Sequence, residues 1–411
     1  QILGADGGFL KSLAVDRPAH VMVHRRTGDV YVLSALVYSD AIPDETVVGA
    51  SVTHFGPFDA PGKKGIYALP DDEFKIKKGS WYRGSGVLFS AEMDSWAAAP
   101  TLWIARELDP QDQSRWRAEY AYHNIRLFML KDGQAVAKAD FRSDVKNQVV
   151  RESVAPLFRQ RLYVHPQTGV LYVGEGDSGA GKSFKELIEI HPESGKASAM
   201  ALPLDAEDMA FDLEGLAYLR TDRLVVRYSM RNWQEVPWDY GEEKAKVSDV
   251  GDDSGRAAPA MSALPLPSRY YWHHGGLAVS PRAHLVASCY IGPKSAPGWG
   301  GAESADTGGA TPFSPKLFPG RAYGPRCAVI HMWNRNGHVV KEDVLPGLGV
   351  IHGVALDKDD SLYVLASAAR VLDGKPYFNR ATGTLMKFRT QQGRIVGSEK
   401  TPVPASDGPR P

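Results

Sequence analysis

The sequence predicts an all-β fold, a β-propeller with six four-stranded antiparallel blades, or seven as the alternative count. A hairpin of apolar strand, polar turn and apolar strand recurs along the chain. Its clearest copies align without gaps: HVMVHRRTGDVYV (20–32), RLYVHPQTGVLYV (161–173) and HGVALDKDDSLYV (352–364). Two more copies begin at 214 and 275, and a less regular one at 84. A repeated four-stranded unit of about 40 to 50 residues is typical of propeller blades.

A second kind of hairpin completes most of the units. Its copies are GIYALPDDEFKIKKG (65–79), IRLFMLKDGQAVAKADF (125–141), ELIEIHPESGKASAMAL (186–202), AVIHMWNRNGHVVKEDV (328–344) and GTLMKFRTQQGRIVGSE (383–399). The copy at 214 lacks an obvious second hairpin. We therefore expect a single propeller domain over 1–411, with a tail at 401–411. The expected blades are 20–80, 84–141, 160–202, 214–265, 275–345 and 352–400.

Composition limits the choice of partner and compartment. Lys plus Arg and Asp plus Glu both number 48 among 411 residues, so no net field favours nucleic acid or an anionic membrane surface. No window approaches 18 consecutive apolar residues, so no membrane span is expected. The chain begins at Gln1 without Met, which favours a processed, secreted or periplasmic protein. Cys289 and Cys327 are either one disulfide or two buried thiols.

The segment Gly176–Ser183, GDSGAGKS, fits the phosphate-binding pattern G-x-x-x-x-G-K-[ST]. That pattern works only between a buried strand and a following helix, where backbone N–H groups and the helix dipole meet the phosphates. Here it falls between two predicted hairpins. We interpret it as a turn that imitates the pattern, and we predict no nucleotide site.

The repeated hairpin and its period resemble six-bladed propellers of the NHL and SMP-30/gluconolactonase type. The resemblance covers most of the chain, at the level of architecture alone. Among these relatives, peptidyl-hydroxyglycine lyases carry metal-binding histidines on inner strands. Their longer local motifs are absent here, so their reaction is not carried over. The run DLEGLA (212–217) is also similar to the acidic entry of phytase-like and esterase-like propellers, which implies calcium binding by Glu214.

The gapless alignment predicts which residues surround the central channel. The residues just before the innermost strands are His20, Arg161, Glu214, Gly275 with His273 and His274 ahead of it, and His352. Imidazole and carboxylate from separate blades are what a transition metal requires. We therefore predict a divalent metal, zinc first and calcium second, held by His20, His274, His352 and Glu214. Two alternatives stay open: structural histidines, and an ion pair between Glu214 and Arg161.

Long loops between second and third strands are expected on the same side, at 38–64, 106–124, 229–258 and 289–326. Such loops are uncommon unless they bind, cover or catalyse. Tyr122 and His123 are the predicted proton-transfer residues, with Arg161 as a catalytic partner. Arg115, Trp299, Tyr323 and His273 are the predicted substrate contacts, because arginine and aromatic planes suit an acidic sugar. His54, Trp233 and Trp238 lie in the same loops; the alternative is that these aromatics pack their own loops.

Three functions follow from these expectations. The first is a secreted, metal-dependent lyase or hydrolase acting on a small or acidic-sugar substrate at the channel mouth. The first alternative is a non-catalytic binding or assembly propeller whose long loops dock another protein. The second is a calcium-dependent propeller of the phytase or esterase type. Serine-nucleophile hydrolysis is disfavoured because no G-x-S-x-G sequence occurs on a strand-to-helix turn.

Overall fold

The computed structural model is all-β over the residues it describes. These are 2–3, 9–16, 18–34, 46–48, 50–69, 74–76, 89–107, 125–140, 161–174, 184–206, 208–220, 225–238, 277–280, 285–291, 327–335, 337, 339–341, 350–357, 359–367, 369–372, 375–378, 383–391 and 394–403. Within these ranges no helix is long and apolar enough to cross a membrane. The chain divides into two compact units, mainly Leu10–Asp205 and mainly Ala206–Arg410, and each is described by itself.

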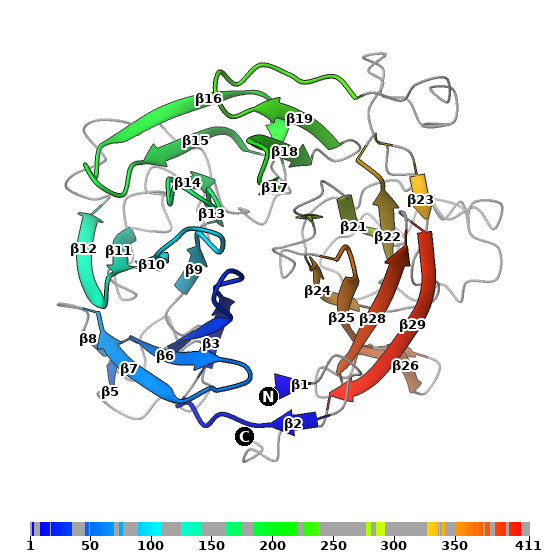
Figure 1. Ribbon diagram of the computed structural model, residues 1–411, viewed down its shortest axis with the longest axis horizontal. Helices are drawn as coiled ribbons and strands as arrows, with labels where there is room; N and C mark the ends of the chain where they lie inside the picture. Colours follow the sequence, from blue (N-terminus) through cyan, green and yellow to red (C-terminus); the bar gives the residue numbers. More distant parts are fainter. Residues whose placement is uncertain are drawn as a thin grey trace. The chain divides into compact units, whose positions relative to one another are not determined.

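The first unit holds three four-stranded antiparallel sheets (Figure 1). The first sheet is β3 (Pro18–Val23), β4 (Asp29–Ser34), β6 (Ser51–Pro57) and β7 (Lys63–Ala68). The second is β9 (Phe89–Met93), β10 (Thr101–Glu107), β11 (Ile125–Lys131) and β12 (Gln134–Asp140). The third is β13 (Arg161–Val164), β14 (Leu171–Gly174), β15 (Phe184–Ile190) and β16 (Ala197–Ala206). In each sheet, sequential strands are neighbours.

The second unit holds one three-stranded and two four-stranded sheets. The fourth sheet is β17 (Asp208–Phe211), β18 (Leu216–Arg220) and β19 (Val225–Ser229). The fifth is β20 (Leu277–Val279), β21 (Leu285–Ile291), β22 (Cys327–Trp333) and β23 (Val339–Lys341). The sixth is β24 (Val350–Leu356), β25 (Leu362–Ser367), β28 (Gly383–Gln391) and β29 (Arg394–Val403).

Three two-stranded ribbons complete the described strands. They pair β1 (Ile2–Leu3) with β2 (Phe9–Lys11), β5 (Thr46–Val48) with β8 (Phe74–Ile76), and β26 (Ala369–Leu372) with β27 (Lys375–Phe378). In the chain, β5 lies between β4 and β6 of the first sheet, and β8 follows the outer strand β7. Strands β26 and β27 lie between β25 and β28 of the sixth sheet.

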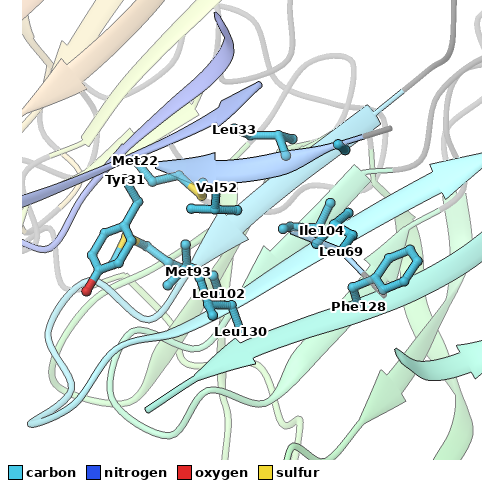
Figure 2. Close-up of a cluster of buried hydrophobic side chains, with 11 residues drawn as sticks. Met22, Tyr31, Leu33, Val52, Leu69, Met93, Leu102, Ile104, Phe128 and Leu130 are labelled. Atoms are coloured by element: carbon cyan, nitrogen blue, oxygen red, sulfur yellow. The ribbon is translucent and has the colours of Figure 1, made fainter. Parts of the chain in front are cut away.

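Apolar faces join neighbouring sheets of the first unit. One buried cluster draws Leu33 and Val52 from the first sheet together with Leu102, Ile104 and Phe128 from the second (Figure 2). A second cluster joins the second and third sheets and includes Trp103, Leu127, Leu171 and Val173. Strands β4 and β14 are buried almost throughout, whereas the outer strand β7 has only exposed and half-buried residues. Successive four-stranded meanders packed face to face are the blades of a β-propeller.

The predicted all-β propeller architecture is therefore confirmed, and the predicted number of four-stranded blades is not. Five sheets have four strands, and the sheet at 208–229 has three. After β19, the chain makes a single isolated bridge between Tyr228 and Glu235 where a fourth strand would lie. Strand β29 also extends to Val403, so part of the expected tail at 401–411 belongs to the sixth sheet. The prediction of one domain over 1–411 stays a prediction.

The second hairpin of the first sheet lies earlier than expected. The sequence predicted both strands within 65–79 and a loop over 38–64. In the structure, β6 (Ser51–Pro57) is the third strand and β7 (Lys63–Ala68) the fourth, so His54 lies in a strand rather than in a loop. The segment at 74–76 pairs instead with β5. The error arose because β6 ends in Gly56 and Pro57, which resemble turn residues.

Candidate functional site: the turn face of the first three sheets

Two of the predicted channel residues, His20 and Arg161, occupy equivalent places in their sheets. His20 is half-buried in β3 and pairs with Leu33, while Arg161 begins β13 and pairs with Gly174. The pairing with the second strands shows the equivalence. Met22, two residues after His20, pairs with Tyr31, and Tyr163, two residues after Arg161, pairs with Tyr172. The gapless alignment of these two copies is confirmed.

His352 is displaced from that position by one residue. In the sixth sheet Tyr363 pairs with Ala355, which makes Gly353 the equivalent of His20. His352 lies at a register irregularity between Ile351 and Gly353. The cause is turn length: the closing bond runs from the His24 N–H to the Asp29 carbonyl in the first sheet, but from the Asp357 N–H to the Ser361 carbonyl in the sixth. The alignment placing His352 with His20 was wrong, because a one-residue slip exchanges the faces of a strand.

Glu214 also lies elsewhere than the alignment predicted. Strand β17 precedes the copy at 214, so Glu214 lies in the turn after the first strand of its sheet, not before that strand. Its Oε2 accepts a hydrogen bond from the Arg335 guanidinium at 3.0 Å, so Arg335 is an ion-pair partner of Glu214. The pair between Glu214 and Arg161 stays a prediction, because the Arg161 side chain lies outside what the structure describes. Asp208 takes the position equivalent to His20. It is buried, and its Oδ2 accepts the Leu277 N–H of the next sheet at 3.2 Å.

Several predicted site residues lie outside the described ranges. They are Arg115, Tyr122, His123, His273, His274, Trp299 and Tyr323, together with Gly176–Ser183. Across the ranges that are described, no group of three or more His, Cys, Asp and Glu side chains is arranged to hold a metal ion. The predicted zinc or calcium site and the catalytic roles of Arg161, Tyr122 and His123 stay predictions. Cys289 and Cys327 lie on adjacent strands, with backbone partners Val329 and Ile291 respectively.

Trp233 and Trp238 belong to the turn that ends the fourth sheet, not to a substrate loop. Trp233 has a positive φ of 53°, and its N–H bonds to the Ser229 carbonyl at 2.8 Å. Trp238 is buried, donates from Nε1 to the Val225 carbonyl at 3.2 Å, and lies 4.5 Å beneath the Arg227 guanidinium. For Trp238 the alternative that loop aromatics pack their own segment is supported.

A histidine or aspartate recurs where the first strand of a sheet ends, and it holds the following turn. Asp212 Oδ1 accepts the N–H groups of Glu214 and Leu216 at 2.8 and 2.9 Å, and its Oδ2 accepts the Tyr218 hydroxyl at 2.8 Å. The same pattern recurs in the sixth sheet with Asp357 and Tyr363. Burial, joined by the nearby aspartate, raises the pKa of both tyrosines. These side chains stabilise hairpins.

In the first unit, the corresponding turns are also bonded to one another. We call the three turns 24–29, 94–101 and 165–170 the turn face. The Arg25 N–H donates to the Ser95 carbonyl at 2.8 Å, and His24 Nε2 donates to the Ala97 carbonyl at 3.0 Å. The Trp96 N–H donates to the Pro166 carbonyl at 2.9 Å. Three consecutive sheets are thus linked at this end by direct hydrogen bonds, as well as by their apolar cores.

Asp94 is the buried acid at the centre of the turn face. It is 2% exposed, and its Oδ1 accepts the Thr101 N–H at 2.6 Å. Burial raises the pKa of Asp94 to about 6, although the bonds from Thr101 act in the opposite direction. Beside it, burial lowers the pKa of the fully buried His24. The interior of the turn face therefore contains two groups that resist carrying charge.

A second polar cluster lies on the first sheet next to the turn face. Asp29 Oδ2 bonds to His54 Nε2 at 2.9 Å, and both Asp29 oxygens accept from Lys64 Nζ at 3.1 and 2.9 Å. The Tyr31 ring stacks on His54 with centroids 4.3 Å apart. Burial alone would raise the pKa of Asp29, but the bonds from Lys64 and His54 outweigh it and hold that pKa below its ordinary value. The acid is neutralised within its own sheet.

Gly169 offers a direct test of how tightly the turn face is packed. Its φ is +71°, and an added Cβ would meet Asp94 Oδ2 at 2.9 Å and Thr101 Oγ1 at 3.3 Å. Gly195 has a similar φ of +64°, and a Cβ added there would have nothing within 4 Å. Gly195→Ala should cost about 1 kcal/mol of unfolding free energy from backbone strain, and Gly169→Ala about 2–4 kcal/mol because of the added contact. Urea unfolding of both variants measures this; equal losses would contradict the packing described.

Sequence reasoning missed the turn face, although its signal was present in the chosen repeats. The polar turns were quoted as HRRTG, HPQTG and DKDDS, and each begins with the residue that holds the turn. The predicted site residues lie at the opposite end of the first strand. The bonds between turns of different sheets had no sequence signal, because they use backbone groups.

Comparisons with known proteins give no family. No protein-family model matches this chain, and no curated protein sequence matches it. Similar solved structures include U3-55K, at 9% identity and a TM-score of 0.39, covering 93% of this chain and 81% of that one. The WD40 domain of SCAP from fission yeast has 8% identity and a TM-score of 0.39, with 95% and 88% covered. The WD40 β-propeller domain of Doa1 has 10% identity and a TM-score of 0.33, with 86% and 87% covered. The resemblance to NHL and SMP-30 proteins goes no further than the propeller fold.

Proposed function

We propose that this protein is a non-catalytic binding propeller that docks another protein chain. The observation that carries the proposal is that the buried and the exposed polar side chains of the turn face have different roles. Its buried histidine and carboxylates, His24, Asp29 and Asp94, hold turns and neighbouring sheets. The side chains turned toward solvent include Arg25 and Arg26, residue types suited to recognition rather than to acid–base chemistry.

The rigidity of the turn face supports docking in particular. A preformed surface loses less conformational entropy when a partner binds than a surface that must become ordered on binding. The bonds from the Arg25, His24 and Trp96 nitrogens fix three turns before any partner arrives. We further propose that the fourth sheet, at 208–229, is a shortened blade that brings the number of blades to six. The bridge at Glu235 takes the place of its outer strand.

The proposal is tested by reconstituting a complex. Chemical cross-linking in an extract of the source cells, followed by mass spectrometry, would nominate partners, and each would be purified and mixed with the protein. Docking predicts a complex of defined stoichiometry by light scattering. The contrary result would be failure to reconstitute any complex, together with metal-dependent turnover in a lyase and hydrolase screen. That result would restore the hypothesis of a metal-dependent enzyme.

A further inference from the structure

The first sheet has a second apolar face, opposite the one that packs on the second sheet. Val30 and Val32 on β4 and Phe55 on β6 form a separate buried cluster on this face. Leu33 and Val52 belong to the cluster shared with the second sheet, because successive residues of a strand point to opposite faces. The first sheet is therefore apolar on both faces.

One row of residues on this second face crosses all four strands. Val21 pairs with Val32, Val32 with Thr53, and Thr53 with Ile66, and paired residues of neighbouring strands lie on the same face. The middle of the row is covered, since Val32 and Thr53 are 5% and 7% exposed. The ends of the row are open, since Val21 and Ile66 are 65% and 54% exposed. These two aliphatic residues enlarge the apolar surface that a partner can cover.

A short segment that follows β2 packs against the buried cluster of this face. Residues 12–16, which we call the strap, belong to no strand, and Leu13 and Val15 lie half-buried against the cluster. The other three residues of the strap are exposed. The strap thus presents an aliphatic residue to the sheet at every second position. It contacts the sheet through side chains, whereas the strands beneath it are joined by ladders of backbone hydrogen bonds.

We propose that the strap covers a docking face for an extended segment of a protein partner that carries aliphatic residues at alternate positions, and that this partner binds by displacing the strap. The inference rests on the docking function proposed above and adds a surface distinct from the turn face. The strap shows what the face accepts, because Leu13 and Val15 form such a pattern and pack on it. A partner can compete because Val21 and Ile66 offer it apolar contacts that the strap leaves open.

A titration with the strap's own sequence tests the face. The probe is the peptide LKSLAVD, residues 10–16, added to the whole chain with carbon-13 in its valine and isoleucine methyl groups. NMR signals of Val32 and Ile66 then report binding. In the wild type the tethered strap competes at an effective concentration on the order of 1 mM. Leu13→Ser, Val15→Ser removes this competitor, so the strap variant should bind the peptide at least about tenfold more tightly than the wild type.

Matched controls change similar residues away from the contact. The peptide LKSSASD lacks the two aliphatic residues and should leave the methyl signals of the strap variant unchanged. Leu10→Ser, Ala14→Ser alters two exposed residues of the same stretch and should bind LKSLAVD as weakly as the wild type does. Urea unfolding checks that both double variants are folded. Leu13→Ala replaces the strap variant if that one does not fold, and it should show a smaller gain in affinity.

Three results would overturn the inference. The first is unchanged methyl signals when the strap variant meets excess LKSLAVD, and the second is equal affinity of the wild type and the strap variant for it. The third is a wild-type dimer that Leu13→Ser, Val15→Ser converts to a monomer by light scattering, because the occupant would then be a second copy of this chain.

The docking function can be judged separately from the strap. The reconstituted partner complex should form more tightly with the strap variant than with the wild type. If it forms with equal affinity in both, docking stands and the strap does not control it. If no partner complex forms with either protein, the docking function itself fails.

Discussion

Trp103→Ala is expected to lower the free energy of unfolding by about 3–5 kcal/mol, the range for deleting a large buried aromatic side chain. Trp103 is fully buried in the cluster between the second and third sheets, where it faces Leu127, Leu171 and Val173 as part of one core. Its Nε1 also donates to the Gly169 carbonyl at 2.8 Å, so the same side chain joins the core to the turn face. Urea unfolding followed by far-ultraviolet circular dichroism measures the loss.

Trp103→Phe separates the two contributions of this residue. The phenyl ring keeps most of the apolar contact but cannot donate to the Gly169 carbonyl, which leaves a buried acceptor without its bond. The expected cost is about 1–3 kcal/mol. If the alanine variant unfolds at the same urea concentration as the wild type, the second and third sheets are not joined through this core. If the phenylalanine variant alone is unchanged, the contact to Gly169 contributes nothing.

Asp94→Asn is expected to change how stability depends on pH by about 3 kcal/mol. Burial raises the pKa of Asp94 from 3.8 to about 6, and each pKa unit corresponds to about 1.4 kcal/mol. The folded protein therefore keeps a proton that the unfolded chain has released. The resulting contribution to stability is fully present below about pH 4 and is lost as the pH rises through 6. The asparagine amide can still accept the Thr101 N–H, but it does not titrate.

The measurement is the difference in unfolding free energy between the wild type and Asp94→Asn, followed from pH 4 to pH 7. The wild type should lose about 3 kcal/mol relative to the variant over this range. His24 works in the opposite sense, because its lowered pKa removes stability as the pH falls below 6.5, but it is present in both proteins and cancels. A difference that does not vary with pH would show that Asp94 is hydrated in the folded state.

Much of the blade structure could be predicted because it depends on local patterns. The hairpins at β11–β12, β15–β16, β22–β23 and β28–β29 lie where alternating apolar residues and Gly-containing turns placed them. Errors occurred where the same sequence allowed two strand assignments that differ by one strand or by one residue of register. The fourth copy was read from β18 rather than β17, and the sixth was read with a turn one residue too long.

The candidate site could be predicted far less well, for a physical reason. A ring of channel residues depends on every blade being in the correct register, so a slip of one residue at His352 or one strand at Glu214 changes the proposed ligand set. The turn face instead depends on bonds between backbone groups of separate sheets, such as the Arg25 N–H and the Ser95 carbonyl. Any residue supplies these groups, so the amino-acid pattern does not reveal them.

Amide hydrogen exchange at Arg25 and Trp96 tests most directly the claim that the turn face is one interlocked surface. Both N–H groups donate to carbonyls of the neighbouring sheet, at 2.8 and 2.9 Å, so they can exchange only when neighbouring sheets separate at this end. The account predicts exchange as slow as that of core strand amides such as Ile104, which lies in the buried centre of β10. Exchange within seconds, at the rate of an open turn, would contradict it, and the docking surface would lose its preformed support.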